Sequence, residues 1–192
     1  DVPFCVANHG SGGSELQGLK PVHAAFAEGI GDRLTPLPGL RKVGLLLINP
    51  GYAVSTSDTY ARWDAKHSRS GGRDRRMAPG RSSGRASARA LAGALSEGDG
   101  HDGVSIDLRR ICPLMSNDLE LLVAEEHGQV LRLKRLLMQA GAAGALMSGS
   151  GPTVFGVYDS PERAEAAAVV FESSVDDHGV RVIPTCTSAL EP

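Results

Sequence analysis

The chain has 192 residues, of which 41% are hydrophobic and 22% charged, so its composition is that of a globular protein and excludes wholesale disorder. Its 20 Lys and Arg residues against 22 Asp and Glu residues give a formal net charge of −2, which excludes a strongly basic nucleic-acid-binding surface. The longest apolar run, residues 43–48, falls far short of the roughly 18 residues that a membrane helix needs, so we expect no membrane partner.

The cysteines and histidines indicate which disulfide and metal sites the chain can form. The three cysteines, Cys5, Cys112 and Cys186, are far apart and form no C-x-x-C pair, which favours a reducing, cytoplasmic location over a disulfide framework or zinc knuckle. The six histidines show no metal-ligand spacing, so we expect no protein metal site. The chain begins at Asp1 without a signal-peptide pattern, and we expect that it was cut or truncated upstream.

The first third of the chain predicts two strands and one helix. Residues 22–28 and the continuous apolar run 43–48 are strand candidates, and the second is expected to be covered on both faces. The hydroxyl-rich segment 55–58 is suited to cap a helix that continues through Trp63. A glycine-containing insert near residues 7–21 is expected to be flexible.

Residues 67–103 are rich in Arg, Gly and Ser and carry almost no large apolar side chain before Leu91. Because such a segment cannot bury enough surface to offset the entropy of ordering it, we expect a mobile surface loop. An RNA-binding Arg/Gly tract is the alternative, but no aromatic side chain follows Trp63 in this segment to stack on a base. We therefore expect no nucleic-acid partner.

Two helices are predicted next. Asn117 followed by Glu120 is typical of a capping box and predicts a helix that ends near His127. Leucines and an alanine in residues 133–140 form one apolar helical face, and Gly141 is a natural residue to end that helix.

The last part of the chain predicts two strands and a helix. The strands are residues 153–158 and 180–185, and Pro184 indicates that the end of the second lies at a sheet edge or in a bulge. Ser160 followed by Pro161 is typical of a helix start. Because strands and helices intermingle without strict alternation, the sequence predicts an α+β fold, with an antiparallel sheet and helices packed on one face.

Two segments have the residue types of a ligand site. Residues 147–156, Met-Ser-Gly-Ser-Gly-Pro-Thr-Val-Phe-Gly, have glycines that let backbone amides turn toward an anion and serines that add donors, so phosphate is a candidate ligand. A tight helix-to-strand turn is the simpler interpretation. Residues 49–56, Asn-Pro-Gly-Tyr-Ala-Val-Ser-Thr, lead into a helix N-terminus, which suits an anionic ligand or ordinary capping equally well.

Five segments taken together resemble the C-terminal half of the GHMP superfamily of small-molecule kinases. In chain order they are Asp1-Val2-Pro3-Phe4, residues 23–31, Asn49-Pro50-Gly51 with Ser55-Thr56, Asn117-Asp118-Leu119-Glu120 and residues 147–156. Within the superfamily, the resemblance is to the kinases that act on a cytidine-diphosphate-linked methylerythritol in non-mevalonate isoprenoid precursor synthesis. It covers nearly the whole chain except the segments near 7–21 and 67–103.

The resemblance implies a nucleotide side and a catalytic base. Asp1 matches the catalytic aspartate, which takes the proton from the substrate hydroxyl as that hydroxyl attacks the γ-phosphate. Gly149, Ser150 and Gly151 belong to the motif that packs against the nucleotide phosphate loop. ATP and Mg²⁺ are the implied cofactors.

The resemblance also implies a substrate side. Ile30 matches an apolar contact to the cytidine end, Thr56 a substrate-contacting threonine, and Tyr60 the aromatic ring that covers the cytosine. The implied partner is therefore a small molecule, a cytidine-diphosphate-linked polyol.

The resemblance divides the chain into two unequal parts. Residues 1–40 would end the N-terminal catalytic domain, and residues 41–192 would form the C-terminal domain with a flexible insert at about 67–103. The family's catalytic lysine and main ATP phosphate loop lie upstream of the aspartate, and neither Lys20 nor Lys42 is placed to replace that lysine. We therefore expect an ATP-dependent kinase as the parent protein and no activity in this chain alone. The alternative is a non-catalytic, truncated module that binds a nucleotide ligand or complements a separate N-terminal half.

Overall fold

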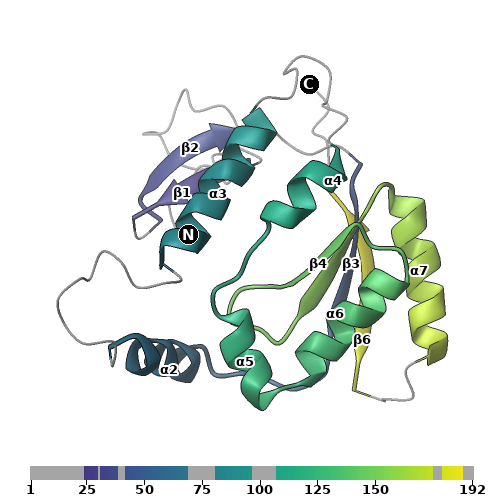
Figure 1. The fold of residues 1–192 in the computed structure, drawn as a ribbon. Helices are drawn as coiled ribbons and strands as arrows, with labels where there is room; N and C mark the ends of the chain where they lie inside the picture. The colour runs from purple at the N-terminus through teal and green to yellow at the C-terminus, as the bar shows by residue number, and fades with distance from the viewer. Residues whose placement is uncertain are drawn as a thin grey trace, which may run out of the picture.

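The computed structural model of the chain describes residues 24–29, 31–38, 42–68, 81–96, 107–174 and 179–187. These residues form helices and antiparallel sheets, as the sequence predicted, with β1, β2 and α3 set to one side of a four-stranded sheet (Figure 1). Within the described ranges, no helix has both the length and the hydropathy needed to cross a bilayer.

The four-stranded sheet has only antiparallel neighbours. Its order is β4-β5-β3-β6, with bounds Gly144–Met147, Val154–Tyr158, Gly44–Asn49 and Arg181–Cys186. β3, β5 and β6 confirm three predicted strands to within one residue at each end, and β6 is an edge strand, as Pro184 indicated. The four residues of β4 include no β-branched or aromatic side chain, and this strand was not predicted.

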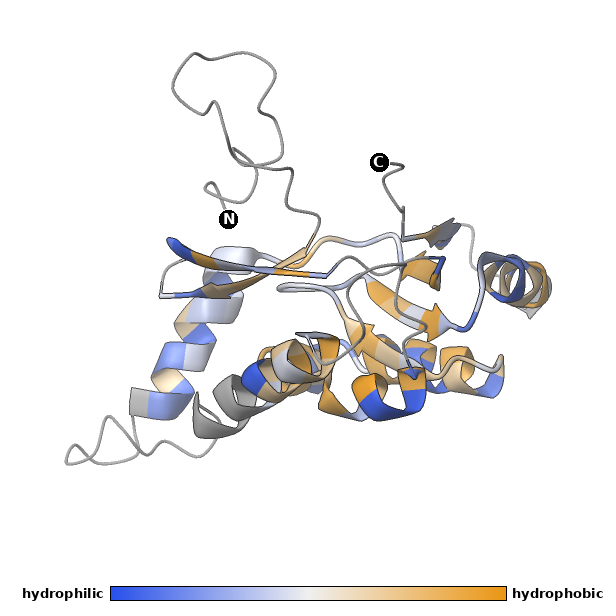
Figure 2. Ribbon diagram, turned by 90° about the horizontal axis from the view of Figure 1, so that it is seen from above, coloured by the Kyte–Doolittle hydropathy of each residue, from blue (hydrophilic) through white to orange (hydrophobic). Residues whose placement is uncertain are grey.

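Helices α6 (Gln129–Gln139) and α7 (Pro161–Ser174) cover one face of this sheet (Figure 1). Alternate residues of a strand point to opposite faces, so Leu46 and Ile48 of β3 point toward these helices and are fully buried. The helices contribute the buried residues Val130, Leu133, Leu137, Ala164, Ala167, Ala168 and Phe171. The strands of this sheet are mostly hydrophobic in Figure 2, and the predicted apolar face of residues 133–140 is confirmed as core.

A short helical turn contacts the opposite face of the sheet. α4 (Leu108–Ile111) continues into the 3-10 helix η1 (Cys112–Leu114), and Leu108 and Cys112 pack with Val43 and Val157. The approach is close: a Cβ on Gly144 would lie 2.6 Å from the Cβ of Cys112. Helices α6 and α7 therefore pack on one face, as predicted, while α4 and η1 add a second apolar cluster that the sequence did not indicate.

A separate two-stranded sheet lies to one side. β1 (Ala24–Glu28) and β2 (Arg33–Leu37) are antiparallel, with Ala24 opposite Leu37 and Glu28 opposite Arg33. β1 confirms a predicted strand. β2 was not predicted, because Pro36 interrupts its short apolar pattern.

Helix α3 (Arg81–Ser96) lies in the stretch for which the composition predicted a mobile loop, and the loop prediction is wrong for these residues. Residues 69–80 and 97–106 lie outside the described part of the chain. Ala88, Leu91, Ala92 and Leu95 recur at helical spacing and line an apolar cavity of about 480 Å³ between α3 and the two-stranded sheet. Composition missed this helix because its apolar face is half alanine and meets its partner only in the folded chain.

Candidate active site

Residues 148–153, the glycine loop, connect β4 to β5 and form a strand-to-strand turn rather than the helix-to-strand turn considered above. The Ser148 amide donates to the Thr153 carbonyl at 2.8 Å, so the loop closes on itself. Gly149 and Gly151 have φ angles of 56° and 85°, which favour glycine. A Cβ on Gly151 would lie 2.7 Å from Met147 Sδ, whereas one on Gly149 would meet nothing within 4 Å. Gly151 is therefore tightly packed, and Gly149 leaves an open surface.

Helix α2 (Thr56–Ser68) brings the second predicted segment to this loop. It begins where predicted, with Ser55 Oγ accepting from the Asp58 amide at 3.3 Å, and it continues past Trp63. Thr56 Oγ1 lies 2.8 Å from Ser150 Oγ, and this hydrogen bond joins residues 94 positions apart. The two segments selected for their hydroxyls and glycines are therefore in direct contact.

A cavity of about 880 Å³ lies beside the glycine loop, a size suited to a small-molecule ligand. Tyr60 and Trp63 of α2 line it together with Ser148 and Gly149 of the loop. Trp63 is partly buried and stacks on His67 with ring centroids 3.8 Å apart, whereas Tyr60 is 54% exposed. Tyr60 is therefore accessible to a ligand in this cavity, and Trp63 belongs to the packing around the core.

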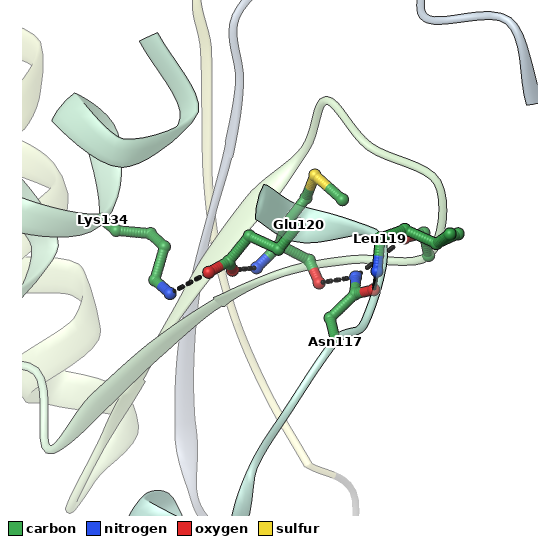
Figure 3. A network of polar contacts seen from close by, with 6 residues as sticks. Asn117, Leu119, Glu120 and Lys134 are labelled. Atoms are coloured by element: carbon green, nitrogen blue, oxygen red, sulfur yellow. Dashed lines mark hydrogen bonds and ion pairs between the residues drawn. The ribbon is translucent and has the colours of Figure 1, made fainter. Parts of the chain in front are cut away.

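Asn117 holds the glycine loop from the side of helix α5 (Glu120–Glu126) (Figure 3). Its Nδ2 donates to the carbonyls of Met147 and Gly149, both at 2.8 Å. Its Oδ1 accepts from the Leu119 amide at 2.9 Å, and Asn117 also lines the large cavity. One carboxamide thus joins the end of β4, the glycine loop and the start of α5.

Glu120 binds the same strand end and is only 7% exposed. Its Oε2 accepts from the Met147 amide at 2.8 Å, and its Oε1 pairs with Lys134 Nζ of α6 (Figure 3). The predicted capping box is therefore wrong in its contacts, although α5 lies where predicted. The Glu120 carboxylate binds β4 rather than the helix start, and Asn117 bonds the Leu119 amide as well as β4 and the glycine loop, while the N-cap residue Leu119 makes no side-chain cap.

Asn49 holds the other end of the loop. Its Nδ2 donates to Thr153 Oγ1 at 3.1 Å, and its Oδ1 accepts from the Gly51 amide at 2.9 Å. Gly51 has a φ of 84°, and a Cβ there would lie 2.3 Å from the Gly179 carbonyl oxygen, so only glycine fits. The Asn-Pro-Gly motif therefore supports the loop and the path of the chain into α2.

Ion pairs fasten α2 to α5 on the outside. Arg62 Nη1 lies 2.6 Å from Glu126 Oε2, and Lys66 Nζ pairs with Glu125 Oε1. The hydrogen bond from Lys66 lowers the pKa of the exposed Glu125 carboxyl. These contacts fix the helix that carries Thr56 relative to the helix that follows Asn117.

Five of the residues singled out from the sequence meet at one place. Thr56 contacts Ser150, Tyr60 and Gly149 line one cavity, and Gly151 shapes the loop between them. Asp1 and Ile30 lie outside the described residues. The described ranges contain no group of three or more His, Cys, Asp or Glu side chains arranged to hold a metal ion.

The sequence alone indicated no individual site role for Asn49, Asn117 or Glu120. The signal was present, since all three lie in segments that carry the family resemblance. Helix capping and turn formation already account for these residue types at these positions. The carbonyl, amide and hydroxyl groups that they bind lie far along the chain, so no local pattern indicates these contacts.

Comparison with known proteins gives a consistent assignment. The family model "GHMP kinases C terminal" matches residues 100–176. The 4-diphosphocytidyl-2-C-methyl-D-erythritol kinase of Alkaliphilus metalliredigens is 34% identical over 87% of this chain and 45% of its own length. The enzyme of the same name from Acaryochloris marina is 34% identical over 100% of this chain and 55% of its own length. The chain thus spans about half the length of these curated relatives.

Solved structures share the fold. A crystal structure of 4-(cytidine 5′-diphospho)-2C-methyl-D-erythritol kinase has a TM-score of 0.53 at 24% identity, covering 86% of this chain and 50% of that one. L. major mevalonate kinase has a TM-score of 0.61 at 16% identity, covering 82% of this chain and 47% of that one. Residues 100–176 therefore match the C-terminal domain of the GHMP kinases, and the chain as a whole is similar to about half the length of the cytidine-diphosphate-linked methylerythritol kinases.

Proposed function

We propose that this chain is the C-terminal part of an ATP-dependent kinase that phosphorylates 4-(cytidine 5′-diphospho)-2-C-methyl-D-erythritol in isoprenoid precursor synthesis. The names of the curated relatives support the substrate, and their greater length supports a larger parent protein. In this proposal residues 1–40 end the N-terminal domain and residues 41–192 form the C-terminal domain. The separation of the β1–β2 sheet from the four-stranded sheet supports a boundary near residue 40.

The contact between Thr56 Oγ1 and Ser150 Oγ carries the proposal. It joins Thr56, which the resemblance assigns to substrate contact, to the loop that the resemblance assigns to the nucleotide side. A phosphoryl transfer requires its two bound molecules to lie side by side in this way. The substrate hydroxyl and the γ-phosphate must be held within reacting distance, and phosphoryl transfer depends mainly on this positioning and on charge stabilisation. The open surface at Gly149 and the two hydroxyls suit phosphate oxygens.

The remaining roles follow the family resemblance. Tyr60 stacks on the cytosine from α2, and Ile30 contacts the cytidine end of the substrate. Asp1 accepts the proton of the substrate hydroxyl as the hydroxyl oxygen bonds to the γ-phosphorus of ATP, and ADP leaves. Mg²⁺ bound with ATP neutralises phosphate charge. Since the described residues offer no cluster of metal ligands, its ligands are expected from ATP, water or the rest of the parent protein.

A paired assay tests this proposal. The full-length protein, incubated with ATP and the cytidine-linked substrate, is expected to turn over at roughly 1–100 s⁻¹, the usual range for kinases. The 192-residue chain alone is expected to show no turnover, because it contains no counterpart of the catalytic lysine or the main phosphate loop. In the full-length protein, Asp1→Asn is expected to lower kcat strongly with little change in substrate binding.

One outcome of this assay would favour a different function. A full-length protein that binds the cytidine-linked substrate without phosphorylating it would contradict the kinase assignment and support a non-catalytic nucleotide-binding module. Recovery of activity on mixing the chain with a separate N-terminal half would instead support complementation between two polypeptides.

A further inference from the structure

Both backbone polar groups of Met147 are bound by side chains rather than by a neighbouring strand. Its carbonyl accepts from Asn117 Nδ2 and its amide donates to Glu120 Oε2, each at 2.8 Å. Met147 ends β4, which is an edge strand, so these groups face away from β5 and need partners of this kind. The Met147 side chain is buried in the main core, and the tightly packed Gly151 lies against its sulfur.

We infer that Asn117 is a positioning residue for the phosphoryl transfer proposed above, and this inference rests on that proposed function. Asn117 does not touch the reacting groups in this account. It fixes the carbonyls of Met147 and Gly149, and thereby holds the glycine loop at the wall of the large cavity with Ser150 in reach of Thr56.

A short series of contacts connects Asn117 to Thr56 through the glycine loop. Asn117 binds the Gly149 carbonyl directly, and it binds the carbonyl of Met147, whose sulfur lies against Gly151. Ser150 lies between these two glycines and makes the contact to α2. A shift of either carbonyl therefore moves Ser150 relative to Thr56, and displacement of about 1 Å at a reacting site can cost on the order of 100-fold in rate.

The alternative role for Asn117 is to start helix α5, and the two roles use different atoms. Only Oδ1 serves the helix start, by accepting from the Leu119 amide at 2.9 Å. Both contacts to the loop come from Nδ2. An aspartate at this position keeps the acceptor, and its negative charge suits a helix N-terminus, but it has no donor for the two carbonyls at neutral pH.

Asn117→Asp in the full-length kinase therefore separates the roles. We expect kcat to fall about 10- to 100-fold, with the KM values for ATP and for the cytidine-linked substrate each changing less than about threefold. Asn117→Ala, which removes the donors without adding a charge beside the carbonyls, is expected to show the same loss. Gln139→Ala is the matched control, since it removes an exposed carboxamide at the end of α6, outside the network.

Hydrogen exchange on the same proteins gives a readout that does not depend on activity. The amides of Ser148 and Gly151 are hydrogen-bonded within the loop, and their exchange is expected to rise at least about tenfold in both Asn117 variants, while exchange in α6 stays unchanged. Aspartate and wild type with equal kcat and equal loop exchange would assign Asn117 to the helix start and overturn the inference. A rise in KM at unchanged kcat would overturn it as well. A wild-type protein without kinase activity contradicts the proposed function, and unchanged loop exchange would then overturn the positioning role separately.

Discussion

Glu120→Ala is expected to be among the most destabilising single substitutions in the C-terminal part. Glu120 is 7% exposed, and its carboxylate has two partners, the Met147 amide and Lys134 Nζ. Alanine leaves a buried amide without an acceptor, and it leaves the ammonium group of Lys134, whose side chain is 23% exposed, without its counter-charge. Both losses act on the junction between β4, α5 and α6.

The size of the effect follows from these two contacts. A buried backbone donor left unsatisfied costs about 1–3 kcal/mol. Breaking a buried ion pair by removing one partner costs about 3–5 kcal/mol, and the partial exposure of Lys134 places this pair at or below the lower end. Because the two terms share one carboxylate, we expect a total loss of about 3–5 kcal/mol, a large fraction of the roughly 5–15 kcal/mol that stabilises a typical domain.

Urea unfolding of the full-length protein measures this loss, and the variants divide it between the two contacts. With slopes of about 1–3 kcal/mol per molar urea, Glu120→Ala is expected to lower the midpoint by about 1–5 M. Glu120→Gln keeps an acceptor for the Met147 amide and should lose less than half as much. Adding Lys134→Met to Glu120→Gln removes the unpaired ammonium and should recover part of the loss. Glu165→Ala, at an exposed position of α7, is the control and is expected to change stability by less than about 0.5 kcal/mol.

A loss below about 1 kcal/mol for Glu120→Ala would refute the reasoning, because the Met147 amide and the ammonium would then have found other partners at little cost. Equal losses for the glutamine and alanine variants would contradict the role assigned to the Met147 amide.

Three further predictions concern other positions. Tyr60→Ala in the full-length kinase is expected to raise the KM for the cytidine-linked substrate about tenfold, because stacking on a base is worth about 1–3 kcal/mol. The KM for ATP should stay unchanged, and Tyr60→Phe should be nearly silent. Equal changes in the KM for both substrates would contradict the stacking role. Gly151→Ala is expected to lower the Tm more than Gly149→Ala, because both require a left-handed φ but only the Gly151 Cβ would meet Met147 Sδ, and the reverse order would show that the loop is packed differently. Burial raises the pKa of Tyr158 to about 12, so the unfolded chain loses this proton at a lower pH than the folded chain, and the free energy of unfolding should fall as the pH rises from about 10 to 12. Tyr158→Phe should reduce that alkaline loss in urea unfolding and cost little at pH 7, since the buried hydroxyl has no hydrogen-bond partner among the described residues. A loss of several kcal/mol at pH 7 would contradict this.

The sequence predicted the elements whose signals are local. A continuous apolar run predicted β3, and the edge position of β6 is one of the two alternatives that Pro184 indicated. Gly141, with a φ of 88°, ends α6 as expected. The failures share one cause. Strands β2 and β4 and helix α3 are short, or carry alanine in place of large apolar residues, and they are stabilised by surfaces that meet them only after folding.

In the candidate site too, the sequence indicated single residues but not the contacts that form between distant parts of the chain. The resemblance selected Thr56 and Ser150 as separate residues, but no local pattern indicates that they meet across 94 positions. Asn117 and Glu120 were interpreted as a capping box because their spacing fits one. The Met147 carbonyl and amide that they bind belong to a strand that was not predicted, and the Gly149 carbonyl belongs to the glycine loop. The roles of Asp1 and Ile30 stay predictions, since both residues lie outside the described ranges.

Substrate selectivity of the full-length protein tests the central claim most directly. Initial rates with ATP are to be measured for the cytidine-linked methylerythritol, for mevalonate and for homoserine, the last two being substrates named for proteins that share the fold. We expect a kcat/KM for the cytidine-linked substrate at least about 100-fold above either alternative. In Tyr60→Ala this preference should fall about tenfold, since loss of roughly 1–3 kcal/mol of stacking corresponds to about 5- to 150-fold. Phosphorylation of mevalonate or homoserine with equal or higher kcat/KM would contradict the central claim.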